Sequence, residues 1–458
     1  MTDYPYAGRF PVQRRLPEVG RPRDELLAEL TAMATEEDAT WETGRCSGTM
    51  YCGDHDHYRF LAEAFERFAH VNALQRDMCP SATKFEGEIV AMALDLFHAE
   101  PGSVGLVTSG GTGSILHAVL AYRERSAERL GGRRPNLVVP ETAHPAFAKA
   151  CHLFGLEERR APIDPVSTLV DLDWVADHVD SATVALVGSA CNYGYGTIDP
   201  IAGLGAIAAE AGIGCHVDAC LGGFLLPFAE ELGHPVGAFD FRVPGVTSIS
   251  ADTHKYGYAV KGTSTVLFAE RELRNAQYSY LTDWSGGKYC SPGMDGSRSG
   301  GLLAAAWASM VSLGRSGYRR YAGEILETAA RMIEAVRSHP ELEVMGGPTF
   351  LFSFTSSDFD VYHVNDFLRT RGWRLNGQQY PNALHMAVTR PQTRPGVVEA
   401  WAEDLDDAVS HAREHAGEAS RSGAIYGGVA GGMTDEADAF VKAVMADLLD
   451  RQTALPPA

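Results

Sequence analysis

A lysine stands directly after a short apolar stretch in the sequence SISADTHKYG, residues 248–257. Residues 247–250 have the composition of a buried β-strand, so Lys255 is expected just beyond a strand end. In open α/β sheets, ligands bind outside the carboxyl ends of the strands. Desolvation among apolar and aromatic neighbours lowers the pKa of a lysine, which would make the neutral amine of Lys255 available for a Schiff base.

Short apolar runs alternate with longer helical patterns on both sides of this segment. The other predicted strands are residues 105–108, 136–140, 183–187, 213–217 and 265–268. Helical spacing of apolar residues follows several of these runs, at residues 113–130, 145–154 and 201–211. Such alternation predicts parallel strands joined by helical crossovers, which is an α/β fold with a mainly parallel central sheet covered by helices.

The chain of 458 residues is long enough for a large domain and a smaller one. A helical pattern at residues 318–338 is followed by strand-like runs at 349–354 and 383–388, which favours a smaller α+β domain at the C-terminal end. The predicted parts are an N-terminal arm at 1–57, a large cofactor-binding domain at 58–315 and a small domain at 316–458.

Composition excludes several classes of function. The 39 Lys and Arg against 59 Asp and Glu give a formal charge of −20, which argues against nucleic acid as a partner. Eight scattered cysteines without a C-x-x-C pair predict reduced thiols in a cytoplasmic protein, and no metal site is expected. We expect neither a secretory signal nor an integral membrane segment, because no suitable apolar window occurs.

Three further motifs follow predicted strands in the same way as Lys255. The Gly-rich turn TSGGTGS, residues 108–114, precedes a helix and would aim backbone N–H groups at a phosphate. Asp218 could hold a cationic ring nitrogen through a charge-assisted hydrogen bond, and His144 could stack on the ring. Together with a lysine for the aldehyde, these motifs predict a site for pyridoxal 5′-phosphate.

Each motif alone has a plainer interpretation. A Gly-rich turn is often only a tight turn, an aspartate after a strand is often a helix N-cap, and a histidine is often a core residue. A single lysine is usually a surface residue. The prediction of a cofactor site therefore depends on their occurrence together at neighbouring strand ends.

The sequence resembles the pyridoxal-phosphate enzymes of the group II decarboxylase class, and within them the sphingosine-1-phosphate lyase family. The matching segments span nearly the whole chain and are residues 47–51, 108–112, 143–147, 195–200, 217–224, 248–257, 296–301 and 372–376. The resemblance implies the fold type I of pyridoxal-phosphate transferases, which is the aminotransferase-like fold.

The resemblance also implies roles for residues at the matching positions. Lys255 would bind the cofactor aldehyde, Asp218 would pair with the pyridine nitrogen, and His144 would stack on the ring. The residues implied to hold the cofactor phosphate are Gly111, Thr112 and His254, with Gly296 and Ser297 from the second subunit of a homodimer with shared active sites. Tyr51 and Lys261 would face the substrate phosphate and, together with Lys255, serve as the catalytic residues.

The resemblance implies that this protein is a carbon–carbon lyase that catalyses the retro-aldol cleavage of a phosphorylated long-chain amino alcohol, such as sphingosine-1-phosphate, to an aldehyde and phosphoethanolamine. The chain departs from the family pattern at Gln75 (usually His), Thr83 (usually Arg) and Gly113 (usually Glu), all near the substrate end. We therefore expect the cofactor chemistry to be kept, while the substrate stays open. An amino-acid decarboxylase, or an aldolase-type enzyme acting on a smaller β-hydroxy amine, would use the same cofactor motifs.

Overall fold

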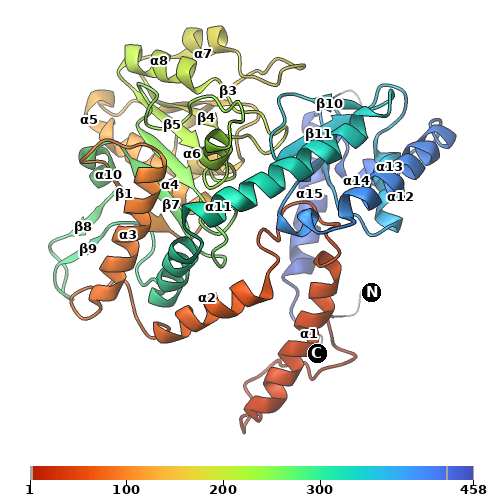
Figure 1. Cartoon of the computed structure of the whole chain (residues 1–458). Coiled ribbons are helices and arrows are strands. Elements are labelled where there is room, and N and C mark those ends of the chain that lie inside the picture. Colours follow the sequence, from red (N-terminus) through yellow and green to blue (C-terminus); the bar gives the residue numbers. More distant parts are fainter. Residues whose placement is uncertain (1–3, 430–431, 457–458) are drawn as a thin grey trace.

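A seven-stranded sheet forms the centre of the larger part of the protein (Figure 1). The computed structural model describes residues 4–429 and 432–456. The strands of the central sheet are β1 (Val104–Thr108), β2 (Asn136–Pro140), β3 (Glu157–Ala161), β4 (Thr183–Ser189), β5 (Gly214–Asp218), β6 (Ser248–Ala251) and β7 (Ser264–Phe268). Their order is β1-β7-β6-β5-β4-β2-β3, and only β7 runs antiparallel to its neighbours. The predicted mainly parallel sheet is confirmed.

Helices cover both faces of this sheet because alternate residues of each strand face opposite sides. In β1, Val107 packs with α3 (Pro80–Leu96) and α8 (Ile201–Ala211) in one core cluster. Its neighbour Leu106 packs in a second cluster with α4 (Gly111–Arg125) and α6 (Ala146–Phe154). The remaining elements of this part are α5 (Ala127–Leu130), α7 (Leu172–His178), α9 (Leu226–Glu231), α10 (Arg271–Ala276) and the hairpin β8 (Ser279–Leu281) and β9 (Tyr289–Ser291).

A smaller antiparallel sheet lies in the C-terminal part of the chain. Its strands are β10 (Glu343–Met345), β11 (Leu351–Thr355), β12 (Asn376–Gln378) and β13 (Ala383–Ala387), in the order β10-β11-β13-β12. The other elements of this part of the chain are α12 (Tyr362–Thr370), the short helix η1 (Arg390–Thr393), α13 (Val397–Glu414), α14 (Gly423–Tyr426) and α15 (Asp435–Gln452). None of the described helices is both long and apolar enough to cross a membrane.

One long helix, α11 (Gly300–Arg337), links the two sheets (Figure 1). It is interrupted at Gly314, whose φ of 57° and ψ of 177° lie outside the helical region. The helix predicted at 318–338 is therefore the second half of a longer element. The predicted domain boundary at residue 316 falls close to this interruption and stays a prediction.

The N-terminal region contributes α1 (Arg23–Trp41) and α2 (His55–Arg67), and the segment between them packs against the small sheet. The backbone N–H of Gly48 donates to the carbonyl oxygen of Ala387 at 3.0 Å, and the Ala387 N–H donates to Ser47 Oγ at 2.9 Å. These bonds hold the segment that leads to Tyr51 against the small sheet.

Candidate active site

Four predicted site motifs meet at one edge of the central sheet. The strands β1, β2, β5 and β6 all run in the same direction, since β1 and β6 are each antiparallel to β7. Their carboxyl ends therefore lie along one edge of the sheet. The Gly-rich turn, His144, Asp218 and Lys255 follow these four ends, which is where α/β proteins bind ligands.

Lys255 lies at the centre of this edge and forms an ion pair. Its Nζ is 2.9 Å from Oδ2 of Asp252, whose side chain is almost completely buried. Burial alone would lower the pKa of Lys255, but Asp252, Cys220 and Tyr51 raise it, and the net shift is upward. The expectation of a lowered pKa for Lys255 is therefore wrong, because the nearby carboxylate outweighs desolvation.

The Gly-rich turn approaches this ion pair closely. A Cβ on Gly111 would lie 2.8 Å from Asp252 Oδ2 and 3.0 Å from Cys220 Sγ, so the position has no room for a side chain. Gly110, with φ 149°, directly precedes α4. The first N–H groups of a helix have no acceptor within it and carry its positive dipole end. The backbone N–H groups of the Gly-rich turn and of Thr112, at the start of α4, thus form a cradle for an anion.

Asp218 ends β5 as a buried carboxylate. It accepts hydrogen bonds from the Cys220 N–H at 3.0 Å and from Ser250 Oγ at 3.2 Å. Burial would raise the pKa of Asp218, but these donors and the nearby His144 and Lys255 lower it, so the carboxylate is ionised. An ionised, desolvated carboxylate suits a protonated ring nitrogen.

His144 and His254 border the same edge. The N–H of Ala146 donates to His144 Nδ1 at 3.1 Å, which fixes the ring while its side chain stays exposed. His254 Nδ1 donates to the carbonyl oxygen of Thr263, and its Nε2 lies 3.7 Å from Asp252 Oδ2. His254 Cε1 would lie 3.7 Å from a Cβ on Gly110, so this ring stands beside the Gly-rich turn.

Tyr51, His254 and Lys261 line a common cavity of about 360 Å³. Lys261 Nζ lies 4.5 Å from the centroid of the Tyr51 ring and donates to the His254 carbonyl oxygen at 3.4 Å. Lys261 is exposed to the cavity, yet the protein around it displaces enough water to lower its pKa to about 8, and Lys255 adds to this shift. Among the described residues, no carboxylate lies within ion-pair distance of Lys261.

The residues present fit pyridoxal 5′-phosphate. Three buried polar atoms near the carboxyl ends of β2, β4 and β6 lack a hydrogen-bond partner: Thr142 Oγ1, Asn192 Nδ2 and Asp252 Oδ1. An amine at Lys255, an ionised Asp218 and a glycine cradle match the aldehyde, ring nitrogen and phosphate of this cofactor.

Comparison with known proteins agrees with this geometry. Residues 11–350 match the pyridoxal-dependent decarboxylase conserved domain. The chain is 41% identical over 415 residues to a sphingosine-1-phosphate lyase of Dictyostelium discoideum. The matched region covers 90% of this chain and 78% of that protein. The chain belongs to the sphingosine-1-phosphate lyase family. It is a pyridoxal-phosphate-dependent lyase.

Solved structures support the same assignment. A sphingosine-1-phosphate lyase of Burkholderia pseudomallei superposes with a TM-score of 0.92 at 54% identity, covering 99% of this chain and 100% of that chain. A glutamate decarboxylase of Lactobacillus brevis gives a TM-score of 0.75 at 21% identity, covering 88% and 96%, which shows the fold alone.

The predicted residues Gly296 and Ser297 do not line the cavity of Tyr51 and Lys261. Ser297 Oγ accepts a hydrogen bond from Asn72 Nδ2 at 3.0 Å. Ser297 also lines a cavity of about 220 Å³ together with Ser109 and Gly262. Gly296 stands next to it, with the Tyr289 hydroxyl 3.8 Å from a Cβ placed on the glycine.

The three departures from the family pattern have different surroundings. Gln75 is exposed and does not line the cavity that holds Lys261. Thr83 Oγ1 accepts a hydrogen bond from Arg76 at 3.5 Å. A Cβ on Gly113 would lie 3.1 Å from Ser109 Oγ, a close but adjustable contact.

Sequence reasoning missed two residues that shape the site. Asp252 stands in the segment SISADTHKYG, three residues before Lys255, and this spacing is a signal for an ion pair. The ring of Tyr193 is tilted against the buried ring of His385, with the centroids 4.5 Å apart. Burial raises the pKa of Tyr193, while Lys255 lowers it. No local signal marked Tyr193, because its position depends on how the small sheet packs against the loop after β4.

Proposed function

We propose that this protein cleaves a phosphorylated long-chain amino alcohol of the sphingosine-1-phosphate type to a long-chain aldehyde and phosphoethanolamine. The observation that carries the proposal is Lys261, a cation without a carboxylate partner among the described residues, in one cavity with Tyr51. An unneutralised ammonium in a partly desolvated cavity favours an anionic group of the substrate. Relatives named as sphingosine-1-phosphate lyases support the same substrate class.

The site residues have distinct proposed roles. When bound, pyridoxal 5′-phosphate supplies an aldehyde that captures amines and a ring that accepts electrons. Lys255 would bind that aldehyde, and Asp218 would accept a hydrogen bond from the protonated ring nitrogen. His144 would hold the ring. The cofactor phosphate is held by Gly111, Thr112 and His254.

Bond cleavage requires a proton acceptor for the C3 hydroxyl of the substrate. As this proton leaves, the C3–O bond becomes the carbonyl of the departing aldehyde and the C2–C3 bond breaks; C2 then takes up a proton to give phosphoethanolamine. Tyr51, Lys255 and Lys261 are the groups proposed to move protons. Burial raises the pKa of Tyr51 to about 12, so its hydroxyl enters the reaction as a proton donor. Arg390 N–H donates to the Tyr51 carbonyl oxygen at 3.2 Å, which keeps this residue in place.

We further propose a homodimer in which Gly296 and Ser297 reach the cofactor phosphate of the second subunit. Large apolar side chains on and near the β8–β9 hairpin are exposed in the single chain; they are Tyr280, Leu281, Trp284 and Met294. They lie next to residues 296–297 in the sequence. Such a surface favours burial against a second copy of the chain.

Incubation of the cofactor-loaded protein with sphingosine-1-phosphate should release a long-chain aldehyde, measured by trapping with a hydrazine and mass spectrometry. Lys255→Ala should abolish the release, while Lys149→Ala, an exposed lysine on α6, should leave it unchanged. Carbon dioxide from an amino acid, without aldehyde from the phosphorylated substrate, would show that the protein is a decarboxylase instead.

The kcat/KM for the phosphorylated substrate should fall as the pH rises through about 8, the lowered pKa of Lys261. A lysine is charged below its pKa and neutral above it, so phosphate attraction is present at lower pH and lost at higher pH. Lys261→Arg keeps its charge throughout and should remove this limb of the pH profile. A limb that persists unchanged in the arginine variant would contradict the role of Lys261.

Mixing two inactive variants should test the shared site. Ser297→Asp places a negative charge beside the partner's cofactor phosphate, and Lys255→Ala removes the amine. Random mixing should restore about a quarter of wild-type activity, because half the dimers are hybrids with one intact site each. If all groups act within one chain, every mixture stays inactive, and the shared-site proposal is wrong.

A further inference from the structure

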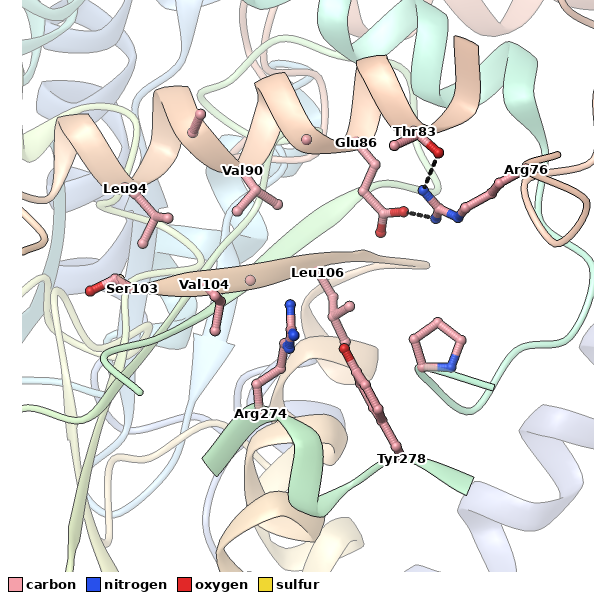
Figure 2. Close-up of a pocket in the computed structure, with 14 residues that line it drawn as sticks. Arg76, Thr83, Glu86, Val90, Leu94, Ser103, Val104, Leu106, Arg274 and Tyr278 are labelled. Atoms are coloured by element: carbon pink, nitrogen blue, oxygen red, sulfur yellow. Dashed lines mark hydrogen bonds and ion pairs between the residues drawn. The ribbon is translucent and has the colours of Figure 1, made fainter. Parts of the chain in front are cut away.

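A buried carboxylate on α3 lies outside the Lys261 cavity and has no role in the proposed chemistry. Glu86 is only 6% exposed and borders a cavity of about 490 Å³ between α3, β1 and α10. Figure 2 shows its carboxylate between the helix and the strand, with the guanidinium of Arg76 beside it. Burying a charge is costly unless it is paired and hydrogen-bonded, so the partners of Glu86 explain its presence.

Glu86 binds the strand that leads into the Gly-rich turn. Its Oε1 accepts a hydrogen bond from the backbone N–H of Val107 at 2.9 Å. Val107 immediately precedes Thr108, the first residue of the turn, and β1 is an edge strand of the sheet. Because β7 covers only one side of β1, Glu86 satisfies a donor on the side that no strand covers.

The same carboxylate binds the segment that carries Gly296 and Ser297. Arg298 Nη1 is 3.0 Å from Glu86 Oε1, and Arg298 Nη2 is 3.2 Å from Glu86 Oε2. Arg298 Nη1 also donates to the carbonyl oxygen of Val107 at 2.8 Å. The guanidinium therefore bonds both the carboxylate and the strand, in the two-pronged geometry that only arginine provides.

Asn72 completes the support of this segment. Asn72 Oδ1 accepts a hydrogen bond from the backbone N–H of Arg298 at 3.3 Å, and Asn72 Nδ2 donates one to Ser297 Oγ at 3.0 Å. The pKa of Glu86 would be raised by burial, but Arg298 and Arg76 lower it, so the carboxylate is charged at neutral pH.

We propose that Glu86 is a positioning residue that fixes the Gly-rich turn and the 296–298 segment relative to each other through Arg298. The inference rests on the proposed function only in that both segments contact a cofactor phosphate, in the same or in neighbouring subunits. Glu86 itself touches neither cofactor nor substrate. Its effect is to hold two phosphate-binding backbone segments in register with each other.

Arg76 supplies a second cation to the same carboxylate. It forms an ion pair with Glu86, and its Nη1 donates to Thr83 Oγ1 at 3.5 Å (Figure 2). Thr83 lies three residues before Glu86 on α3, which places the two on one helix face. An arginine at position 83 could therefore reach Glu86 from the helix itself. In this protein Arg76, from the loop before α3, provides the second cation that pairs with Glu86.

The test compares Glu86→Gln and Arg298→Lys with Glu88→Gln. Glu88 is on the same helix but is about half-exposed; it forms an ion pair with Lys84 and accepts a hydrogen bond from Trp307 Nε1 instead. The readouts are pyridoxal 5′-phosphate affinity, by absorbance titration of the apoprotein, and amide hydrogen exchange of residues 107–113 and 296–299. Neither readout requires a substrate, so failure of the proposed reaction would leave this result standing.

Both test variants should weaken cofactor affinity about tenfold, the loss expected for one charge-assisted hydrogen bond. Amide exchange should increase in residues 107–113 and 296–299 and nowhere else. The double variant should bind the cofactor about tenfold more weakly than wild type, not about a hundredfold, because both changes break the same Glu86–Arg298 link. Glu88→Gln should behave as wild type. If Glu86→Gln does not fold, Arg298→Lys, which retains the charge, carries the comparison alone.

Rescue gives a second measurement that a general loss of stability would not produce. Arg76→Ala should increase exchange at residues 296–299, and Thr83→Arg in the same chain should reverse that increase. Cofactor affinity and segment exchange at wild-type values in both Glu86→Gln and Arg298→Lys would overturn the proposal. Exchange that rises evenly along the whole chain would also overturn it, since it would mean that Glu86 only stabilises the fold.

Discussion

The buried ion pair between Lys255 and Asp252 is the contact on which the site depends. Its 2.9 Å separation keeps an ammonium at the carboxyl end of β6, where an unpaired charge would be costly. Gly111 must be a glycine because this carboxylate fills the space that its side chain would need. The same pair thus fixes both the reactive amine and the position of the anion cradle.

The long helix α11 and the small sheet both hold the Lys255 segment. The carbonyl oxygen of Gly257 accepts hydrogen bonds from Ser309 Oγ at 3.0 Å and from the Tyr318 hydroxyl at 2.9 Å, on either side of the interruption in α11. The Tyr256 hydroxyl donates to the Val388 carbonyl oxygen, next to β13, at 2.8 Å. The segment is therefore rigid because it is bonded to α11 and to the small sheet at once.

The sequence predicted the buried strands well, since β2, β5 and β6 are short apolar runs bounded by turn residues. It missed β3, whose sequence EERRA is charged because it lies at the sheet edge. The site motifs could be predicted because the carboxyl ends of strands that run in the same direction lie along one edge of the sheet. The net pKa shift of Lys255 and the link from Glu86 to Arg298 could not be predicted from the sequence. Glu86 and Arg298 are 212 residues apart in the chain, so only the folded structure shows that they are in contact.

Lys255, despite its raised pKa, is the amine proposed to bind the cofactor. Borohydride reduction of the cofactor-loaded protein, followed by peptide mass spectrometry, measures this directly. We expect a pyridoxyl mass on the peptide containing Lys255 and none on Lys261, although the lower pKa of Lys261 makes it the more available free amine. Label on Lys261, or no label on either lysine, would contradict it.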